Sequence, residues 1–346
     1  MLALLLLVTF APTAFADEAA RVLAPYERTE WADFLKDLRL DPGKAYVLIV
    51  QVPSAYPIDL RTPETARRSL LRNVRDPSAR IKAKTLIGHT MVGWQCSTGK
   101  GLISKSGEKD GQAMRMALSG WGLTPLLSTY LDGHLVTLDD FPWRHADRIR
   151  RGKASILAAQ ISERSCQALR RYLVRYITNP LEPAKRFSWL LDVDGFEGDG
   201  CASFALTAAS KTGLFAGILE RFNRRISVYD GLIGWKTKAP NETVPFVKAA
   251  NVNGIRIIRF SRLVDGPWDS GNLFATFDVV DPELIFAGIM ELRRLAGERG
   301  GALQDRALSA DDPVVRRLNH AIAGWAKRHY RHFRFVEGIG ALVLER

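Results

Sequence analysis

The stretch AYVLIVQV, residues 45–52, is a continuous run of apolar and β-branched residues. A run of this length and composition is typical of a strand that is buried within a sheet. After it, Thr62-Pro63-Glu64 has the residues favoured at a helix start, because threonine caps free N–H groups and proline fits the first turn. We expect that helix to end at about Val74, before Asp76-Pro77. This region therefore predicts strands and helices in one fold.

Working outward from this strand, the pattern alternates between strand-like and helix-like segments. It predicts a strand over 82–96, a hairpin or exposed loop over 97–110, one long helix over 154–177, and a helix over 201–212 closed by Gly213. From about residue 220 it predicts strands over 225–229, 244–247, 254–260, 273–280 and 336–344, and helices over 281–296 and from 311 onward. The predicted class is α+β.

Length and composition indicate a globular protein. The 346 residues are 47% hydrophobic and 25% charged, a balance that excludes a mainly disordered chain. The only sustained apolar run lies in the first sixteen residues, which excludes a polytopic membrane protein. The three cysteines are too few to build a disulfide scaffold.

The N-terminal stretch MLALLLLVTFAPTAFA predicts an export signal. Its apolar run is closed by Ala14-Phe15-Ala16, which resembles a signal-peptidase site, although no Lys or Arg precedes the run. An uncleaved anchor or a buried helix is the alternative, but the run is short for a membrane span. We predict a signal peptide over 1–16 and a periplasmic location.

Two segments carry residues suited to catalysis. In GDGCASFA, residues 198–205, a glycine-rich turn places Cys201 at a helix start, where free N–H groups and the helix dipole favour a thiolate and can stabilise an oxyanion. In GHTMVGW, residues 88–94, His89 lies on a strand and could carry the proton of a leaving group. Taken singly, a buried structural cysteine and a strand histidine with satisfied hydrogen bonds are the alternatives.

These two motifs, in this order, resemble those of the circularly permuted papain-like cysteine hydrolases, which are related to the NlpC-type peptidases and lecithin:retinol acyltransferase. Within that superfamily, the segments are similar to those of the Lnb-like N-terminal periplasmic domain. The resemblance covers about residues 45–215 and implies Cys201 as nucleophile and His89 as general base or ion-pair partner. It also implies a permuted papain-like domain over 17–220, with an appended β-rich C-terminal region over 221–346.

The sequence departs from the family pattern at two points. The family usually has asparagine before the cysteine, whereas this chain has Asp199-Gly200. The polar residue that orients the histidine usually lies on the following strand, and no recognisable motif marks it here. The polar residues available for that role are Gln95, Ser106, Glu108 and Asp110.

The other two cysteines, Cys96 and Cys166, either form a disulfide in an oxidising compartment or remain as two buried thiols. His329 and His332 are three residues apart, but arginine residues surround them, which is a poor setting for a metal ion. The sequence also has no glycine-rich motif that would bind the phosphates of a cofactor. We therefore expect no metal and no cofactor.

A formal charge of +12 indicates an anionic partner. Basic residues gather over 144–153, 164–175 and 316–334. Export argues against nucleic acid, so we expect peptidoglycan or another anionic envelope component, with peripheral contact to a membrane surface; a merely solvated basic surface is the alternative.

Together these observations predict an exported cysteine hydrolase that cleaves an amide or ester in the cell envelope, with a peptidoglycan peptide favoured. A lipid acyltransferase or esterase, and a non-catalytic envelope protein with a degenerate site, are the alternatives. We expect the side chains of Cys201 and His89 to meet at or near hydrogen-bond distance, and residues 221–346 to pack on the first part because no flexible linker separates them.

Overall fold

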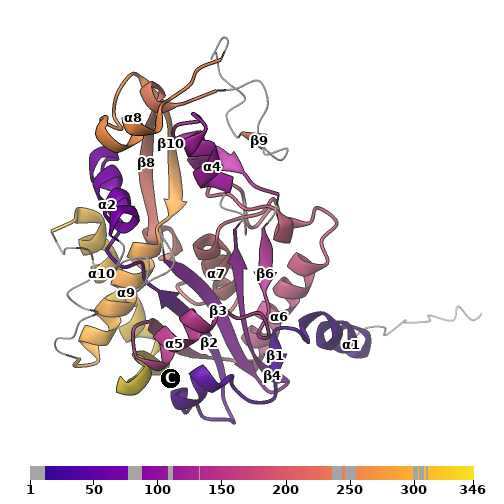
Figure 1. Cartoon of the computed structure of the whole chain (residues 1–346). Helices are drawn as coiled ribbons and strands as arrows, with labels where there is room; N and C mark the ends of the chain where they lie inside the picture. The colour runs from indigo at the N-terminus through magenta and orange to yellow at the C-terminus, as the bar shows by residue number, and fades with distance from the viewer. Residues whose placement is uncertain are drawn as a thin grey trace, which may run out of the picture.

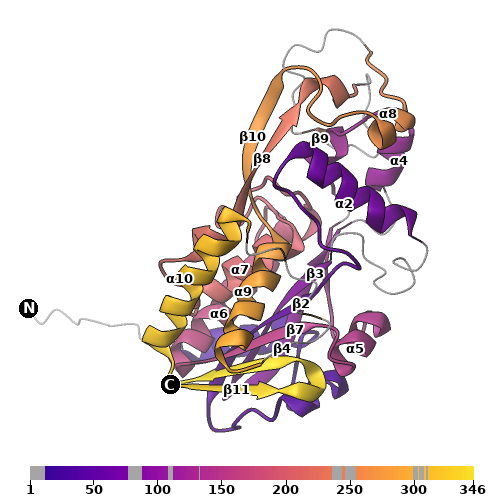
Figure 2. The ribbon, with the colours of Figure 1, turned by 90° about the vertical axis from the view of Figure 1, so that its left-hand side faces the viewer.

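A computed structural model describes residues 12–76, 88–107, 112–131, 133–235, 244–245, 255–298, 303, 308 and 311–346. In this part of the chain, helices surround a mixed eight-stranded sheet, and a smaller lobe extends from one end of the sheet (Figures 1 and 2). The predicted α+β class is confirmed. Most of the predicted signal peptide lies outside the described residues, and helix α1 (Pro12–Leu23) begins within it.

The main sheet has the strand order β1-β4-β3-β2-β7-β12-β11, with β6 paired to the far end of β4. Its strands are β1 (Glu27–Arg28), β2 (Ala45–Val52), β3 (His89–Cys96), β4 (Gly99–Ser106), β6 (His134–Val136), β7 (Ser155–Ile161), β11 (His332–Val336) and β12 (Ala341–Glu345). β7 and β12 are parallel, and the other pairs are antiparallel.

Strand β2 is central because all eight of its residues are buried, as its apolar run predicts. Val47 and Ile49 face a core that includes helices α6 (Glu163–Ile177), α7 (Cys201–Ser210), α9 (Pro282–Leu295) and α10 (Pro313–His329). Tyr46 and Leu48 face a second core with helix α5 (Trp143–Arg150). Helices therefore cover both faces of the sheet.

The smaller lobe has its own apolar core, with residues such as Leu127, Val228 and Trp268. Its elements are α2 (Pro63–Arg75), α4 (Gln112–Leu118), α8 (Phe260–Asp265), the antiparallel pair β8 (Asn223–Tyr229) and β10 (Leu273–Val280), and the short pair β5 (Ser128–Thr129) and β9 (Val244–Pro245). Short 3-10 helices complete the described structure at 33–38, 124–127, 183–185, 219–222, 230–232 and 337–339.

Helix starts agree closely with the sequence. Thr62 caps α2 by accepting a hydrogen bond from the Thr65 N–H, and Asp281 and Asp312 cap α9 and α10 in the same way. The hairpin predicted over 97–110 is formed by β3 and β4. Of the predicted strand over 82–96, the first part lies outside the described residues.

The long helix predicted over 154–177 is wrong. Residues Ser155–Ile161 form β7, which lies between β2 and β12, and only Glu163–Ile177 is helical. Ser162 separates the two elements because its side chain caps α6 by accepting from the Ser165 N–H. The strand predicted over 254–260 is also absent, since Arg256 and Ile258 make only isolated bridges and Phe260 begins α8.

The C-terminal residues complete the main sheet. β12 pairs in parallel with β7, and β11 forms the edge beyond it. Residue 220 therefore does not separate two sheets, because strands from both sides of it share one hydrogen-bonded ladder.

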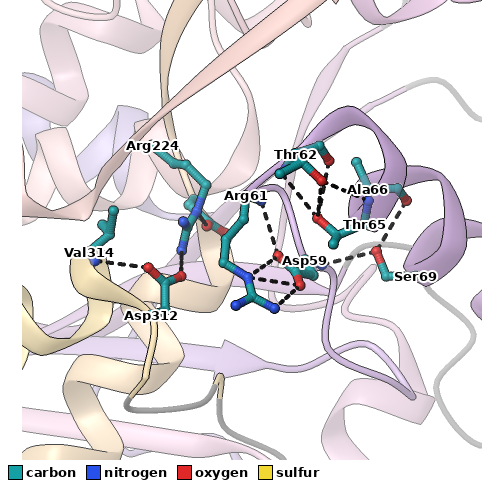
Figure 3. Close-up of polar contacts among 10 residues, drawn as sticks. Asp59, Arg61, Thr62, Thr65, Ala66, Ser69, Arg224, Asp312 and Val314 are labelled. Carbon is teal, nitrogen blue, oxygen red and sulfur yellow. Dashed lines mark hydrogen bonds and ion pairs between the residues drawn. The ribbon is translucent and has the colours of Figure 1, made fainter. Parts of the chain in front are cut away.

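A buried arginine ties three elements together, as Figure 3 shows in part. Arg224 of β8 donates to Asp281 at 2.7 Å and to Asp312 at 2.8 Å. These carboxylates are also the caps of α9 and α10, through Glu283 N–H and Val314 N–H. Figure 3 also shows the Asp59–Arg61 ion pair and the Thr62–Thr65 cap nearby. The Arg224 guanidinium thus attaches the starts of α9 and α10 to strand β8 of the smaller lobe.

Cys96 of β3 and Cys166 of α6 form a disulfide. This confirms the first of the two alternatives for these residues and leaves Cys201 as the free cysteine. Within the described ranges, no helix combines the length and apolar character needed to cross a bilayer.

Candidate functional site

His89 is the first residue of β3 and follows a glycine in a left-handed conformation. Gly88 has φ +78°, and a Cβ there would lie 3.0 Å from the Val52 carbonyl oxygen. Glycine is needed at this point because a side chain would be strained and crowded against β2. The turn delivers His89 to the end of the sheet where β3 begins.

Cys201 is the first residue of α7, as the sequence predicts. The preceding Gly200 is in extended conformation, and its N–H donates to the Ser203 hydroxyl, which holds the first turn. The backbone N–H groups of Thr90, Ala202 and Cys201 itself favour the thiolate and so lower the pKa of the Cys201 thiol. The thiol is therefore held between the start of β3 and the start of α7.

This arrangement brings the two predicted residues to one place in the fold, because the Thr90 N–H belongs to the peptide bond that follows His89. Pairing between β3 and β4 runs from Cys96 to Val92 and stops before this end, where β4 pairs with β6 instead. Within the described segments, no hydrogen bond joins the side chains of His89 and Cys201. That they lie at or near hydrogen-bond distance stays a prediction.

The His89 ring is held by Ser104 and His145. Its Nε2 lies 3.0 Å from the Ser104 hydroxyl on β4, and its ring stacks on His145 of α5 with centroids 5.2 Å apart. Its Nδ1 makes no hydrogen bond to a residue in the described segments. Ser104 is thus a polar residue on the following strand that orients the histidine, a role the sequence did not assign to it.

Burial keeps both histidine rings neutral. Although His89 retains partial exposure as a residue, its ring is enclosed, and burial lowers its pKa to about 3, with help from His145 and His134. Burial, and then Arg148, lowers the pKa of His145 to about 4. Burial also raises the pKa of the Cys201 thiol, more than its N–H contacts lower it. The resting pair is therefore a neutral thiol and a neutral imidazole.

These shifts predict loss of stability in mild acid. An unfolded histidine takes up a proton near pH 6.5, whereas the folded rings resist protonation until pH 3–4. Below pH 6.5, the free energy of unfolding should fall by up to about 1.4 kcal/mol per pH unit for each histidine. His145→Asn should remove one such contribution, measured by urea unfolding between pH 7 and pH 5, with the exposed His332→Asn as matched control. An unchanged slope in His145→Asn would contradict this account.

Asp199, which differs from the pattern of the hydrolases that the motif resembles, is buried and paired. Asp199 lies 3.0 Å from the Lys105 ammonium and accepts from the Tyr176 hydroxyl at 3.0 Å. Lys105 also donates to the Pro183 and Arg186 carbonyl oxygens. Burial raises the pKa of Asp199 and lowers that of Lys105, and each is partly offset by the other. This cluster fixes the segment before Cys201 against β4.

One small cavity adjoins the thiol, and a second shares two lining residues with it. The first, of about 50 Å³, is lined by Cys201 together with Ile58, Phe187 and Val279. The second, of about 80 Å³, is lined by residues such as Leu70, Leu126 and Trp268. Leu60 and Trp189 line both cavities. Leu60 and Trp189 therefore separate the cavity beside the thiol from the cavity in the smaller lobe.

The other polar residues proposed to orient His89 lie elsewhere. Gln95 accepts from the Trp31 indole N–H and donates to backbone carbonyls of Asp41 and Lys44, which is a structural role. Ser106 pairs through its backbone with His134. Residues 108 and 110 lie outside the described residues. Alternation along β4 could have found Ser104, because it follows the buried Leu102 on the same face.

Among the residues that the structure describes, no group of three His, Cys, Asp or Glu side chains is arranged to hold a metal ion. Comparison with protein-family models, with curated proteins and with solved structures finds no match. The argument for function therefore rests on the site itself.

Proposed function

We propose that this protein is an exported cysteine hydrolase that attacks an amide or ester carbonyl in the cell envelope. The observation that supports the proposal is the placement of the Cys201 thiol. It lies at a helix start, where backbone N–H groups lower the pKa of the thiol, and it lines a small cavity. These N–H groups would stabilise the sulfur as its proton leaves. The resemblance to permuted papain-like hydrolases agrees with this reading.

In the proposed mechanism, the Cys201 sulfur attacks the carbonyl carbon, and its proton passes to Nδ1 of His89, which has no hydrogen-bond partner in the described segments. The imidazole is neutral at rest and has a lone pair for that proton, but burial lowers its pKa to about 3 and raises the pKa of the thiol. The transfer is therefore unfavourable in the resting site and has to accompany the attack on the carbonyl. His89 then gives the proton to the leaving oxygen or nitrogen as that bond breaks. Water or an acceptor attacks the thioester, which releases the acyl group and restores the thiol. Ser104 would hold Nε2 throughout.

The lining of the two cavities bears on the substrate class. About half of the lining residues are Leu, Ile, Val, Phe or Trp, and the others include Asp281 and Glu283 in the first cavity and Arg61 and Arg225 in the second. On the apolar part of these linings, we take a lipid ester or acyl lipid as the first candidate substrate. A peptidoglycan amide, which the compartment favours, is the second candidate.

The basic surface fits an anionic envelope partner in both cases. Arg164, Arg171 and Arg175 of α6 are exposed. Arg170 is an exception to the predicted basic surface, because it is buried and paired with Glu27 at 2.7 Å.

The test is to incubate the purified chain with phospholipid vesicles and, separately, with muropeptides, and to measure products and the intact protein mass. We expect released fatty acid and an acyl adduct on Cys201, both absent in Cys201→Ala. Cleavage of muropeptides alone would move the substrate to peptidoglycan. No product and no adduct with either substrate would refute the enzymatic proposal.

A further inference from the structure

Three exposed aliphatic side chains lie close together at the outer end of the smaller lobe. Leu118 at the end of α4 is 58% exposed, and Ile255 and Ile257 are 63% and 61% exposed. A Cβ at Gly120 would lie 2.6 Å from Ile257, which places the end of α4 beside this segment. We call Leu118, Ile255 and Ile257 the tip patch. Figures 1 and 2 show α4 and α8 together at this end of the molecule.

The backbone fixes the outward direction of these side chains. Ile258 is buried in the core of the lobe and forms a bridge with Trp121. Arg256 exchanges both backbone hydrogen bonds with Trp235. Because the segment is extended here, Ile257 points away from the core that Ile258 enters. Folding of the lobe therefore leaves the two isoleucines in solvent rather than covering them.

Basic residues predominate around the tip patch, although α8 ends at the exposed Asp265. Residues 255–262 read IRIIRFSR, with three arginines and no acidic residue. Arg259 and Arg262 are exposed, and their side chains pair with no other side chain in the described ranges. In α4, Arg115 adds a fourth cation and no carboxylate is present. Aliphatic residues flanked by arginine are the composition that binds an anionic lipid surface.

We propose that the tip patch docks on an anionic phospholipid membrane, with its aliphatic side chains entering the interface and the exposed Arg259 and Arg262 contacting the phosphates. A second copy of the chain fits this surface less well, because a symmetric contact would bring the arginines of both copies together. The second cavity is lined by Leu123 and Leu126, which follow α4, so this cavity belongs to the same lobe as the tip patch. This inference concerns binding and does not depend on Cys201.

The test is hydrogen exchange of the full chain with vesicles of phosphatidylcholine alone or mixed with phosphatidylglycerol. A site-resolved measurement is needed because the apolar N-terminal stretch can itself bind vesicles. We expect slower exchange in residues 255–262 with the anionic vesicles only, weakening as salt is added. Ile255→Ser/Ile257→Ser should weaken this protection at least tenfold in lipid concentration. Leu181→Ser, at a 50% exposed leucine elsewhere, should leave it unchanged.

Three results would overturn the proposal. Protection without vesicles that increases with protein concentration would assign the surface to a second copy. Protection that persists in the double serine variant would place the contact elsewhere. No protection with anionic vesicles would show that the tip patch does not dock on lipid.

Discussion

Replacing Arg224 with methionine should lower the free energy of unfolding by about 3–5 kcal/mol at neutral pH, because it leaves two buried carboxylates without their counter-ion. Asp281 and Asp312 are 0% and 2% exposed. Both lie at the starts of helices, so their caps are disturbed together. Urea or thermal unfolding measures this loss. It should shrink in mild acid, since orphaned carboxylates can then take up protons.

Two controls separate the effect of leaving buried carboxylates unpaired from the effect of removing an arginine as such. Arg221→Met breaks an exposed pair with Glu220 and should cost about 0–1 kcal/mol. Adding Asp281→Asn and Asp312→Asn to Arg224→Met should recover part of the stability, because it removes the unpaired charges. If Arg224→Met costs no more than Arg221→Met, the triad does not hold the fold as described.

Replacing Cys201 with alanine should reduce turnover at least about a thousandfold, because no other group in the proposed mechanism can form the thioester. His89→Ala should cost about 10²–10⁴-fold, the range of general acid–base catalysis. The measurement is release from phospholipid and from a simple ester such as p-nitrophenyl butyrate. The thermal midpoint of Cys201→Ala should remain close to that of the parent protein, since the change is small.

Ser104→Ala serves as the graded control, because it removes only the contact to His89 Nε2. We expect it to lose less activity than His89→Ala and to shift the pH profile. Retained turnover in Cys201→Ala would refute the nucleophile assignment. If only His89→Ala retains turnover, the thiol acts with another proton acceptor and His89 has a packing role against His145.

Local signals explain which elements were predictable. Thr62-Pro63, Asp281-Pro282 and Asp312-Pro313 mark helix starts through hydrogen bonds within a few residues, so no tertiary contact is needed to recognise them. The strand over 45–52 was predictable because a short apolar β-branched run suits a buried strand. Cys201 at the start of α7, and Gly213 after its end, follow the same local rules.

Where apolar spacing suits both a helix and a buried strand, the neighbours decide. Ser155–Ile161 is apolar without a period of two, and it became β7 because β2 and β12 offer hydrogen bonds on both sides. The sequence alone could not supply those partners, since β12 comes from the end of the chain.

The sequence by itself determined the fold class, the starts of α2, α7, α9 and α10, the candidate nucleophile and histidine, and the basic charge, because each depends on neighbouring residues or on composition. Tertiary structure decided that Cys96 bonds to Cys166, that Ser104 holds His89, and that Lys105 pairs with Asp199. These contacts join residues 15 to 94 positions apart, and they form only because chain folding brings distant segments within hydrogen-bond distance away from water.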